Sequence, residues 1–307
     1  MSESESSAQR SFMAVLLIAL FLSSLSSHAA LSSLGQATNF AVLVYGTAST
    51  PQQVSMSNPQ SGVFGNFGLG PYSVQNFSDG FITGTLYVDP TANNSHNNNV
   101  KSSLLGTSPP PSLAYNLSSA VTDAQQASAA FSALPTTMTL GNVQTALTIN
   151  GNGGVNVISI ASLEYTDASD ILTLNGNANE YFIFNVTAGG IVKMTHNLST
   201  MIANGGLSAD HIVWNILGTG QDVAFTGNPT VLGTILALDR KVQLDPGDLF
   251  GEVITGEGLS ITSGARIHQL AFDPTSIPEP AAMSLFGLGV SGLVILRYPR
   301  TVRRRRR

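Results

Sequence analysis

Short apolar runs recur at regular spacing along the middle of the chain, and this periodicity restricts the possible folds more than any other feature. The run LTING at 147–151 returns as LTLNG at 172–176. The run VNVISI at 155–160 has counterparts at 181–186 and 211–216. Each run is strand-sized, rich in β-branched and aromatic residues, and bounded by turn formers such as Gly and Asn. The pattern predicts a series of equivalent short strands.

Towards the C-terminus the spacing of these runs becomes shorter. The triplet at 233–235 parallels the one at 251–253, and the runs at 223–225, 242–244 and 259–261 follow one another at similar intervals. A repeat of about 20 residues with one short strand per face is the length of one β-solenoid coil. We therefore predict a mainly β fold, a parallel β-helix. A jelly roll or a β-sandwich remains open, because short strands alone do not separate these architectures.

A single stretch of the middle region has clear helical periodicity. Ser112 is a suitable N-cap, and apolar residues recur three and four positions apart from Leu113 to Leu134, until Pro135 ends the pattern. An amphipathic helix among many strands buries its apolar side against a sheet. We expect one α-helix at about residues 112–134, packed alongside the β-helix.

The N-terminus has the features of an export signal. Ten apolar residues at 13–22 follow Arg10 and would form a helix of only about 15 Å, half the thickness of a membrane's hydrocarbon core. Ser27 and Ala29 supply the small side chains of a secretory cleavage site. The sequence predicts a signal helix within a signal peptide at 1–29, cleaved after Ala29. An uncleaved membrane anchor is the alternative.

The C-terminus consists of three parts in a fixed order: Ile-Pro-Glu-Pro at 277–280, a mostly apolar segment at 281–296, and an arginine-rich tail. The apolar segment would form about 24 Å of helix, which can cross a membrane if the flanking arginines extend to the headgroups. Arginines directly after the segment place this end on the cytoplasmic side. We expect a transmembrane helix at 281–296 within a signal at 275–307. The signal residues are Pro278, Glu279, Pro280, Arg297, Arg300 and Arg303.

This tripartite arrangement closely resembles the PEP-CTERM sorting signal of Gram-negative bacteria. In that family a membrane-embedded exosortase cuts near the Pro-Glu-Pro, and the proteins are associated with exopolysaccharide and the cell surface. The resemblance implies an exosortase-type processing protease and exopolysaccharide or cell-surface components as partners. It also implies transient tethering in the inner membrane, followed by release to the cell surface or extracellular matrix.

The charge of the middle region excludes one large class of partners. Between Ala30 and Ile277 the chain carries five Lys and Arg against fifteen Asp and Glu, a net charge of −10. So few cations cannot neutralise many phosphates, and nucleic-acid binding is therefore excluded. The chain has no Cys, which removes disulfides, thiolate nucleophiles and Cys-bound metals.

No motif points to catalysis. Zinc-protease, phosphate-loop, dinucleotide and nucleophile-elbow motifs are absent from the sequence, and the five His are scattered. We expect no catalytic residue, no cofactor and no enzymatic activity. Asp245 and Asp248 belong to the densest acidic cluster and have the oxygen ligands that Ca²⁺ prefers. A solvated turn explains the same two residues better, because Asp is a common turn residue.

The middle region resembles a known group. The segment LGQATNFAVL at 34–43 looks like the opening of ice-binding-like domains, and the runs at 181–186, 211–215 and 233–238 look like their β-helix coils. The chain is similar to the ice-binding-like adhesive domains of the choice-of-anchor A group, which carry interchangeable C-terminal anchors. The resemblance implies that residues 30–274 form a discontinuous β-helix with a helix along its side.

Three functional hypotheses follow. The preferred one is an exported, non-catalytic structural or adhesive protein of the cell surface or matrix. The alternative is an ice-binding protein that acts through a flat face bearing Thr and Ser, although its candidate threonines do not recur at a coil-to-coil period. The remote alternative is a polysaccharide-active β-helix enzyme, for which the coils offer the basic residues Lys193, Arg240, Lys241 and Arg266. The candidates for an ice-binding face are Thr83, Thr85, Thr148 and Thr173.

Overall fold

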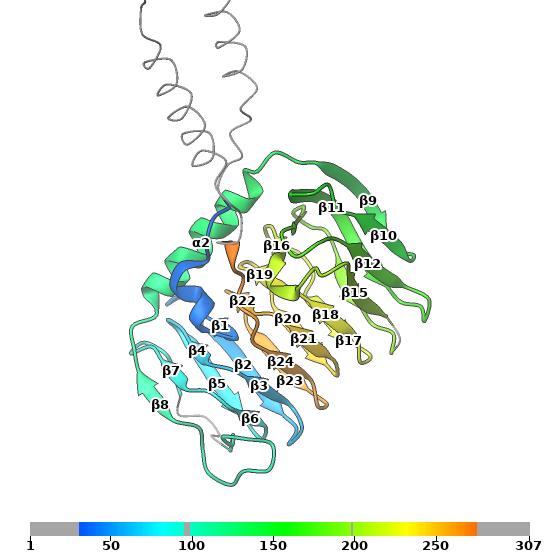
Figure 1. Ribbon diagram of the computed structural model, residues 1–307. Coiled ribbons are helices and arrows are strands. Elements are labelled where there is room, and N and C mark those ends of the chain that lie inside the picture. Colours follow the sequence, from blue (N-terminus) through cyan, green and yellow to red (C-terminus); the bar gives the residue numbers. More distant parts are fainter. Residues whose placement is uncertain (1–30, 95–98, 198, 275–307) are drawn as a thin grey trace, which may run out of the picture. The chain divides into compact units, whose positions relative to one another are not determined.

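The computed structural model describes residues 31–94, 99–197 and 199–274, which belong to one compact unit (Figure 1). Every strand pairing in this part of the chain is parallel. The strands stack into coils with three faces. The predicted parallel β-helix is confirmed, whereas the antiparallel pairing of a jelly roll or sandwich is absent from the described residues.

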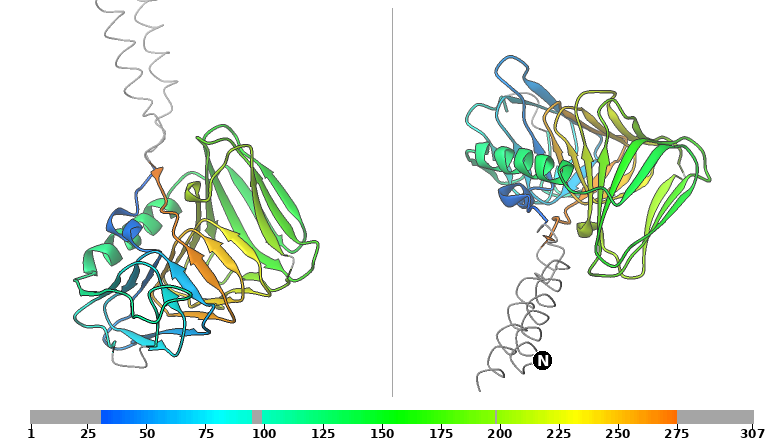
Figure 2. Two further views of the ribbon diagram at one scale, coloured as in Figure 1. Left: turned by 60° about the horizontal axis from the view of Figure 1, so that its bottom comes forward. Right: turned by 90° about the horizontal axis from the view of Figure 1, so that it is seen from above.

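The first face, called the helix face here, lies beside the helix α2 (Ser118–Ser132), as Figures 1 and 2 show. The long strand β11 (Val155–Tyr165) starts on this face and turns onto the next, because its two halves pair with different neighbours. The helix face consists, from one end to the other, of β8 (Ser112–Ala114), β7 (Leu86–Val88), β4 (Phe67–Leu69), β1 (Val42–Val44), β22 (Val253–Thr255), β19 (Thr234–Ala237), β16 (Ile212–Ile216), β13 (Tyr181–Val186), the first half of β11, and β9 (Met138–Val143).

The other two faces are named after the side chains that they present. The serine face consists of β5 (Ser73–Phe77), β2 (Gln52–Ser57), β23 (Leu259–Thr262), β20 (Val242–Asp245), β17 (Val223–Thr226), β14 (Val192–Met194) and the second half of β11. The aromatic face consists of β6 (Phe81–Ile82), β3 (Gly62–Phe64), β24 (Arg266–His268), β21 (Asp248–Phe250), β18 (Thr230–Leu232), β15 (Thr200–Asn204), β12 (Ile171–Asn175) and β10 (Leu147–Asn150).

The register of neighbouring coils matches the sequence repeats. Strand β10 pairs with β12 so that residues 147–150 lie beside 172–175. Strand β13 lies between β11 and β16, as the repeated runs predict. The shorter repeats also become neighbours, with β19 beside β22 and with β17, β20 and β23 side by side. Each repeat is therefore one coil.

The β-helix is discontinuous. The chain builds the coils from β1 to β8, passes along α2, and resumes at β9 at the far end of the solenoid (Figure 1). From there it winds back until β22, β23 and β24 dock on β1, β2 and β3. The central junction thus pairs Val42 with Val253, two residues that are far apart in the sequence. This arrangement is the one that the family resemblance implied.

Inward-facing side chains stack from coil to coil and form one core. Phe184 and Trp214 lie in parallel contact with ring centroids 4.0 Å apart, and the indole Nε1 donates to the carbonyl of Leu232 at 3.0 Å. Burying a large apolar side chain in this way contributes about 1.5–3 kcal/mol. Corners are tight: a Cβ on Gly251 would lie 2.1 Å from the carbonyl oxygen of Gly233 in the neighbouring coil. Only glycine allows the two corners to approach so closely.

The helix begins at Ser118, not at Ser112 as the periodicity predicted. Residues 112–114 instead form β8, which pairs with β7, and Leu113 is half exposed. At the helix start Asp89 Oδ2 accepts a 3.0 Å bond from the Leu117 backbone N–H, and Asn116 Oδ1 accepts a 2.9 Å bond from that of Ser118. Asp89 comes from a distant turn, whereas Asn116 is a local signal that the apolar periodicity does not include. Short 3₁₀ segments are η1 (Gly35–Asn39), which packs against α2, and η2 (Ala209–His211).

Several predictions concern parts of the chain outside the described residues. These are the signal peptide with its cleavage site at Ala29, the sorting signal with Pro278, Glu279 and Pro280, and the transmembrane segment 281–296. Within the described ranges, no helix has the length and apolar character needed to cross a membrane.

Candidate functional site

Burial patterns show which solenoid faces can meet a partner. On the helix face, β13 and β19 are buried at every position, because their inward side chains fill the core and their outward side chains lie beneath other segments. On the serine face, β17, β20 and β23 alternate between buried and partly exposed positions. Alternation of this kind marks a sheet that faces water on one side. The serine and aromatic faces are therefore the uncovered surfaces.

Hydroxyl and amide side chains form in-register rows on the serine face. Ser55 of β2 lies beside Ser260 of β23, with their Oγ atoms 3.2 Å apart, and Ser57 lies beside Thr262. Neighbouring strands are about 4.8 Å apart and alternate residues along a strand about 6.6 Å apart, so these hydroxyls form a small grid. The row through Ser55 continues in both directions and consists of Asn76, Ser55, Ser260, Gln243, Ala224, Lys193 and Glu164.

The hydroxyl grid was not found from the sequence. Ser55 and Ser260 are 205 residues apart and meet only because the last coil docks on the first. The grid ends where larger groups enter: Gln243 donates to Asp222 Oδ2 at 2.7 Å, and Asp245 lies beside Thr226. The serine face can thus offer many hydrogen bonds and few charges over several coils.

The aromatic face carries a stack of rings. His268 lies between Phe250 and Phe64, with ring centroids 4.6 Å from each and nearly parallel planes. Its Nε2 is 3.0 Å from Asp248 Oδ1. Since parallel stacking covers both faces of the imidazole and one face of each phenyl ring, the stack presents mainly ring edges to solvent. It ties β21, β24 and β3 together across the central junction.

The predicted threonines lie in two separate places. Thr148 and Thr173 are register neighbours on β10 and β12 of the aromatic face, so the structure brings this pair together. The next position in their row is Ile202, which interrupts the series of hydroxyls. Thr83 and Thr85 lie between β6 and β7 near the other end, where Thr83 Oγ1 accepts a bond from the Gly65 backbone N–H at 3.1 Å.

Asp245 and Asp248 flank the corner between β20 and β21. Asp245 points outward on the serine face beside Thr226, whereas Asp248 bonds to His268 on the aromatic face. No group of three or more His, Cys, Asp or Glu that could hold a metal ion occurs among the described residues. The two carboxylates thus belong to different faces of the solenoid.

Three of the basic residues of the coils, Lys193, Arg240 and Arg266, lie in separate places. Lys193 is outward on β14 of the serine face, and Arg266 lies on β24 of the aromatic face. Arg240 is buried at a corner, where burial lowers the pKa of its guanidinium. Its Nε donates to the carbonyl of Gly218 at 2.9 Å and its Nη2 to that of Leu217 at 3.0 Å, while Nη1 contacts the carbonyl of Gly190. This guanidinium therefore joins the corners of successive coils.

One carboxyl group is fully buried on the helix side. Glu252 Oε2 accepts a 3.3 Å bond from Thr234 Oγ1, and the backbone N–H of Phe272 also bonds to this carboxyl. Removal from water raises its pKa to about 8. The segment that covers it is held by Phe272, whose ring packs edge-on against Phe131 of α2 and against Tyr181. The group is sealed from solvent and faces no open surface.

Together these features define a class: a discontinuous, three-faced parallel β-solenoid with a helix along one face and two uncovered, weakly charged faces. The sequence profile of the ice-binding-like adhesive domain family matches residues 29–269, so the chain belongs to this family. The profile of the PEP-CTERM protein-sorting motif matches residues 276–300. A comparison with curated proteins found no match.

Similar solved structures share the fold. An ice-binding protein from an Arctic yeast has 19% sequence identity and a TM-score of 0.53, covering 82% of this chain and 97% of its own. An ice-binding protein from an Antarctic biological consortium has 17% identity and a TM-score of 0.55, covering 77% of this chain and 90% of its own. One from an Antarctic Flavobacteriaceae bacterium has 19% identity and a TM-score of 0.53, covering 78% and 47%.

Proposed function

We propose that this protein is an exported, non-catalytic adhesive module whose serine face binds neutral, hydroxyl-rich polymers at the cell surface or in the extracellular matrix. The observation that carries the proposal is the in-register row through Ser55 and Ser260 on a face that none of the described elements covers. Hydroxyl and amide groups both donate and accept hydrogen bonds, as the groups of a polysaccharide do. Many such weak contacts along a rigid coil stack add up to firm attachment.

The sorting motif supports the location that the proposal requires. A PEP-CTERM signal at residues 276–300 follows directly after the family domain. In this proposal the signal peptide exports the chain, the C-terminal segment tethers it in the inner membrane, and an exosortase processes it for delivery to the surface. The partners would be the exosortase and exopolysaccharide or cell-surface components.

A retention assay with matched variants tests adhesion. The double variant Ser55→Arg/Ser260→Arg places two bulky cations in the middle of the serine face, while Thr173→Arg/Thr230→Arg makes the same change on the aromatic face. We expect the first variant to lose retention on matrix polysaccharide at least tenfold and the second to bind like the parent. Equal retention of all three chains, or retention that requires only the C-terminal tail, would refute the role of this face.

A second candidate function is ice binding, and the same hydroxyl grid favours it. Ser55, Ser57, Ser260 and Thr262 form a two-by-two array of small hydroxyls, and ice-binding proteins share the fold. The array ends at Gln243 in the adjoining coil, and the same row continues through Ala224 to Lys193, which favours adhesion as the first proposal. Ice binding would be supported by thermal hysteresis or inhibition of ice recrystallisation that disappears in the Ser55→Arg/Ser260→Arg variant. The absence of both effects in the parent protein would refute ice binding.

A further inference from the structure

The two ends of the solenoid differ in how their last strands are protected. At one end the final rung consists of β9 and β10, residues 138–150, called the open rung here (Figure 1). Strand β9 pairs only with β11, and β10 pairs only with β12. Among the described residues, nothing pairs with the outer edge of either strand. These edges therefore present unpaired backbone N–H and C=O groups that can form a ladder with another chain.

Core side chains are also uncovered at the open rung. Leu140, Val143 and Leu147 point into the core yet remain partly exposed. Their neighbours one coil further in are fully covered: Leu140 lies beside Ile160, and Leu147 beside Leu172, both of which are buried. The apolar interior thus reaches solvent at this end, since no further coil or loop of the described chain covers it.

The open rung lacks the usual protection of a strand edge. Residues 136–154 contain no charged side chain and no proline, the two kinds of residue that commonly prevent edge pairing. An amide ladder leads to the same rung, with Asn204 Nδ2 donating to Asn175 Oδ1 at 3.0 Å and Asn175 Nδ2 to Asn150 Oδ1 at 2.8 Å. Its last amide, Asn150, lies on the outer strand and can extend the ladder to a partner.

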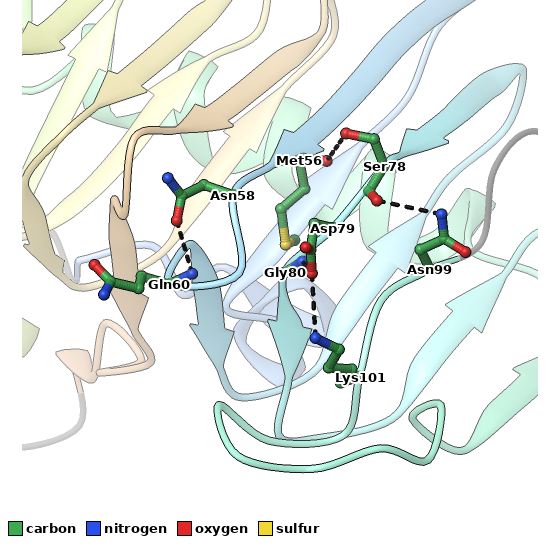
Figure 3. Close-up of polar contacts among 8 residues, drawn as sticks. All are labelled: Met56, Asn58, Gln60, Ser78, Asp79, Gly80, Asn99 and Lys101. Atoms are coloured by element: carbon green, nitrogen blue, oxygen red, sulfur yellow. Dashed lines mark hydrogen bonds and ion pairs between the residues drawn. The ribbon is translucent and has the colours of Figure 1, made fainter.

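The opposite end is closed. Beyond β5 and β6 the described residues add single bridges, at Asn93 and Lys101, and on the helix face the three-residue strand β8 ends the sheet. Figure 3 shows how this segment is held: Lys101 Nζ lies 3.5 Å from Asp79 Oδ1, and Asn99 Nδ2 donates to the Ser78 carbonyl at 3.3 Å. The residues before the short edge strand β8 are Pro109–Pro111. Charge, irregular pairing and proline all oppose the addition of another strand here.

We propose that the open rung is a homodimer interface, where two copies of this chain meet end to end about a two-fold axis. A second copy supplies an edge of the same length, the same coil cross-section and the same lack of charge. Two edges related by such an axis run antiparallel, which allows a regular ladder. The rung with its corners, residues 136–154, is close in size to the roughly 20–30 residues per side of a standard interface.

The difference between the two ends decides against other arrangements. Head-to-tail stacking would need the open rung to pair with the closed end, where the Lys101–Asp79 pair and the prolines stand in the way. A two-fold dimer buries both open rungs and leaves closed ends outward, so assembly stops at two copies. The proposal adds a partner to the adhesive role and is independent of it, since a dimer can form whether or not the serine face binds a polymer.

Sedimentation of the exported protein over a range of concentrations tests the proposal. We expect a concentration-dependent mass of two chains. The variant Thr139→Lys/Thr148→Lys brings like charges to both sides of the interface and should raise the dimer dissociation constant at least tenfold. The matched variant Ser55→Lys/Ser260→Lys adds the same charge to the serine face and should dimerise like the parent. Thermal unfolding of each variant shows whether the fold is retained.

Cross-linking locates the contact. Because the chain has no Cys, single cysteines at Thr139, Asn142 or Thr148 are the only thiols present. Intermolecular disulfides should form from at least one of these positions and not from Ser260→Cys. A monomer at all concentrations, a dimer that the lysines do not weaken, assemblies larger than two copies, or occupation of the edge by a peptide of another protein would each overturn the proposal.

Discussion

The helix face and the serine face are built by the same coils, yet they have opposite surroundings. Strand β19 is buried at all four positions, whereas β20, which follows it in the same coil, buries every second residue only. Polar groups differ accordingly. On the helix face Asn215 Nδ2 donates to the Ser128 carbonyl at 2.9 Å and to Asn185 Oδ1 at 2.8 Å, whereas the hydroxyls of the serine face are open to solvent. The inner side of each coil thus builds the core, while its outer side either contacts other segments or faces solvent.

This difference predicts that substitutions at buried polar groups will destabilise the protein, whereas those on the serine face will alter binding alone. The largest effect is expected at Arg240, at the corner where the two faces meet. Arg240→Met removes the donor for carbonyls from successive coils and should lower the free energy of unfolding by about 3 kcal/mol or more. Lys193 is a basic residue that points outward, so Lys193→Met should change the free energy of unfolding by less than about 0.5 kcal/mol. Equal losses in denaturant titrations of the two variants would contradict the structural role of Arg240.

Asn215 and Asn175 provide a second comparison, between a buried and an exposed asparagine that each bond to a neighbouring asparagine. Asn215→Ala removes the hydrogen bonds that this amide makes with Ser128 of α2 and with Asn185 Oδ1 in a dry contact, so we expect a loss of about 2–3 kcal/mol. Asn175→Ala interrupts the exposed ladder, where water replaces the lost bonds, and should change stability by less than about 1 kcal/mol. Chemical denaturation of both variants gives the comparison, and a similar loss in the two would show that α2 does not depend on this network.

The pH dependence of stability sharpens the contrast further. Glu252 has a pKa of about 8 in the folded chain, above the value of 4.5 that is usual for a free side chain. The folded state therefore holds a proton that the unfolded state has already lost, and stability should fall as pH rises from about 4.5 to about 8. The slope from this group is at most about 1.4 kcal/mol per pH unit. Glu252→Gln keeps the shape and should flatten this part of the profile, which thermal unfolding at several pH values measures; an unchanged slope would contradict the assignment.

The smallest effect on stability is expected on the serine face. Ser260→Ala removes one outward hydroxyl, whose partner in the chain is Ser55 Oγ, and should change the free energy of unfolding by less than about 0.5 kcal/mol. Polymer binding should nevertheless weaken measurably if this face carries the proposed function. A marked loss of stability would show that the hydroxyl row is structural.

The sequence predicted those features of the fold that repeat locally. From β9 onward each coil follows directly after the previous one along the chain, so repeats such as 147–151 and 172–176 revealed the strand neighbours and their register. The helix was found from its periodicity, but its start was placed too early, at Ser112 instead of Ser118. At that start the Leu117 backbone N–H donates to Asp89, which lies 28 residues earlier in the sequence. Nothing in the local pattern signals this contact.

The candidate site depends on pairings that no local pattern reveals. The row through Ser55 and Ser260 arises where the last coil meets the first. These two residues are 205 positions apart in the sequence, so no repeat connects them. Thr148 and Thr173, which do repeat at a coil length, were found as register neighbours. The sequence identified Arg240 only as one of the few basic residues of the coils. Its structural role depends on the carbonyl groups of Gly190, Leu217 and Gly218, which it contacts only in the folded chain.

The central junction also sets an order of events in time. While the chain is being made, β1, β2 and β3 have no neighbour on one side, because the strands that complete them are the last ones of the solenoid in the sequence. The solenoid can close only after all of its strands have been made. The sorting motif begins shortly after the last of these strands, so the junction can close only when the chain has been made almost as far as this motif.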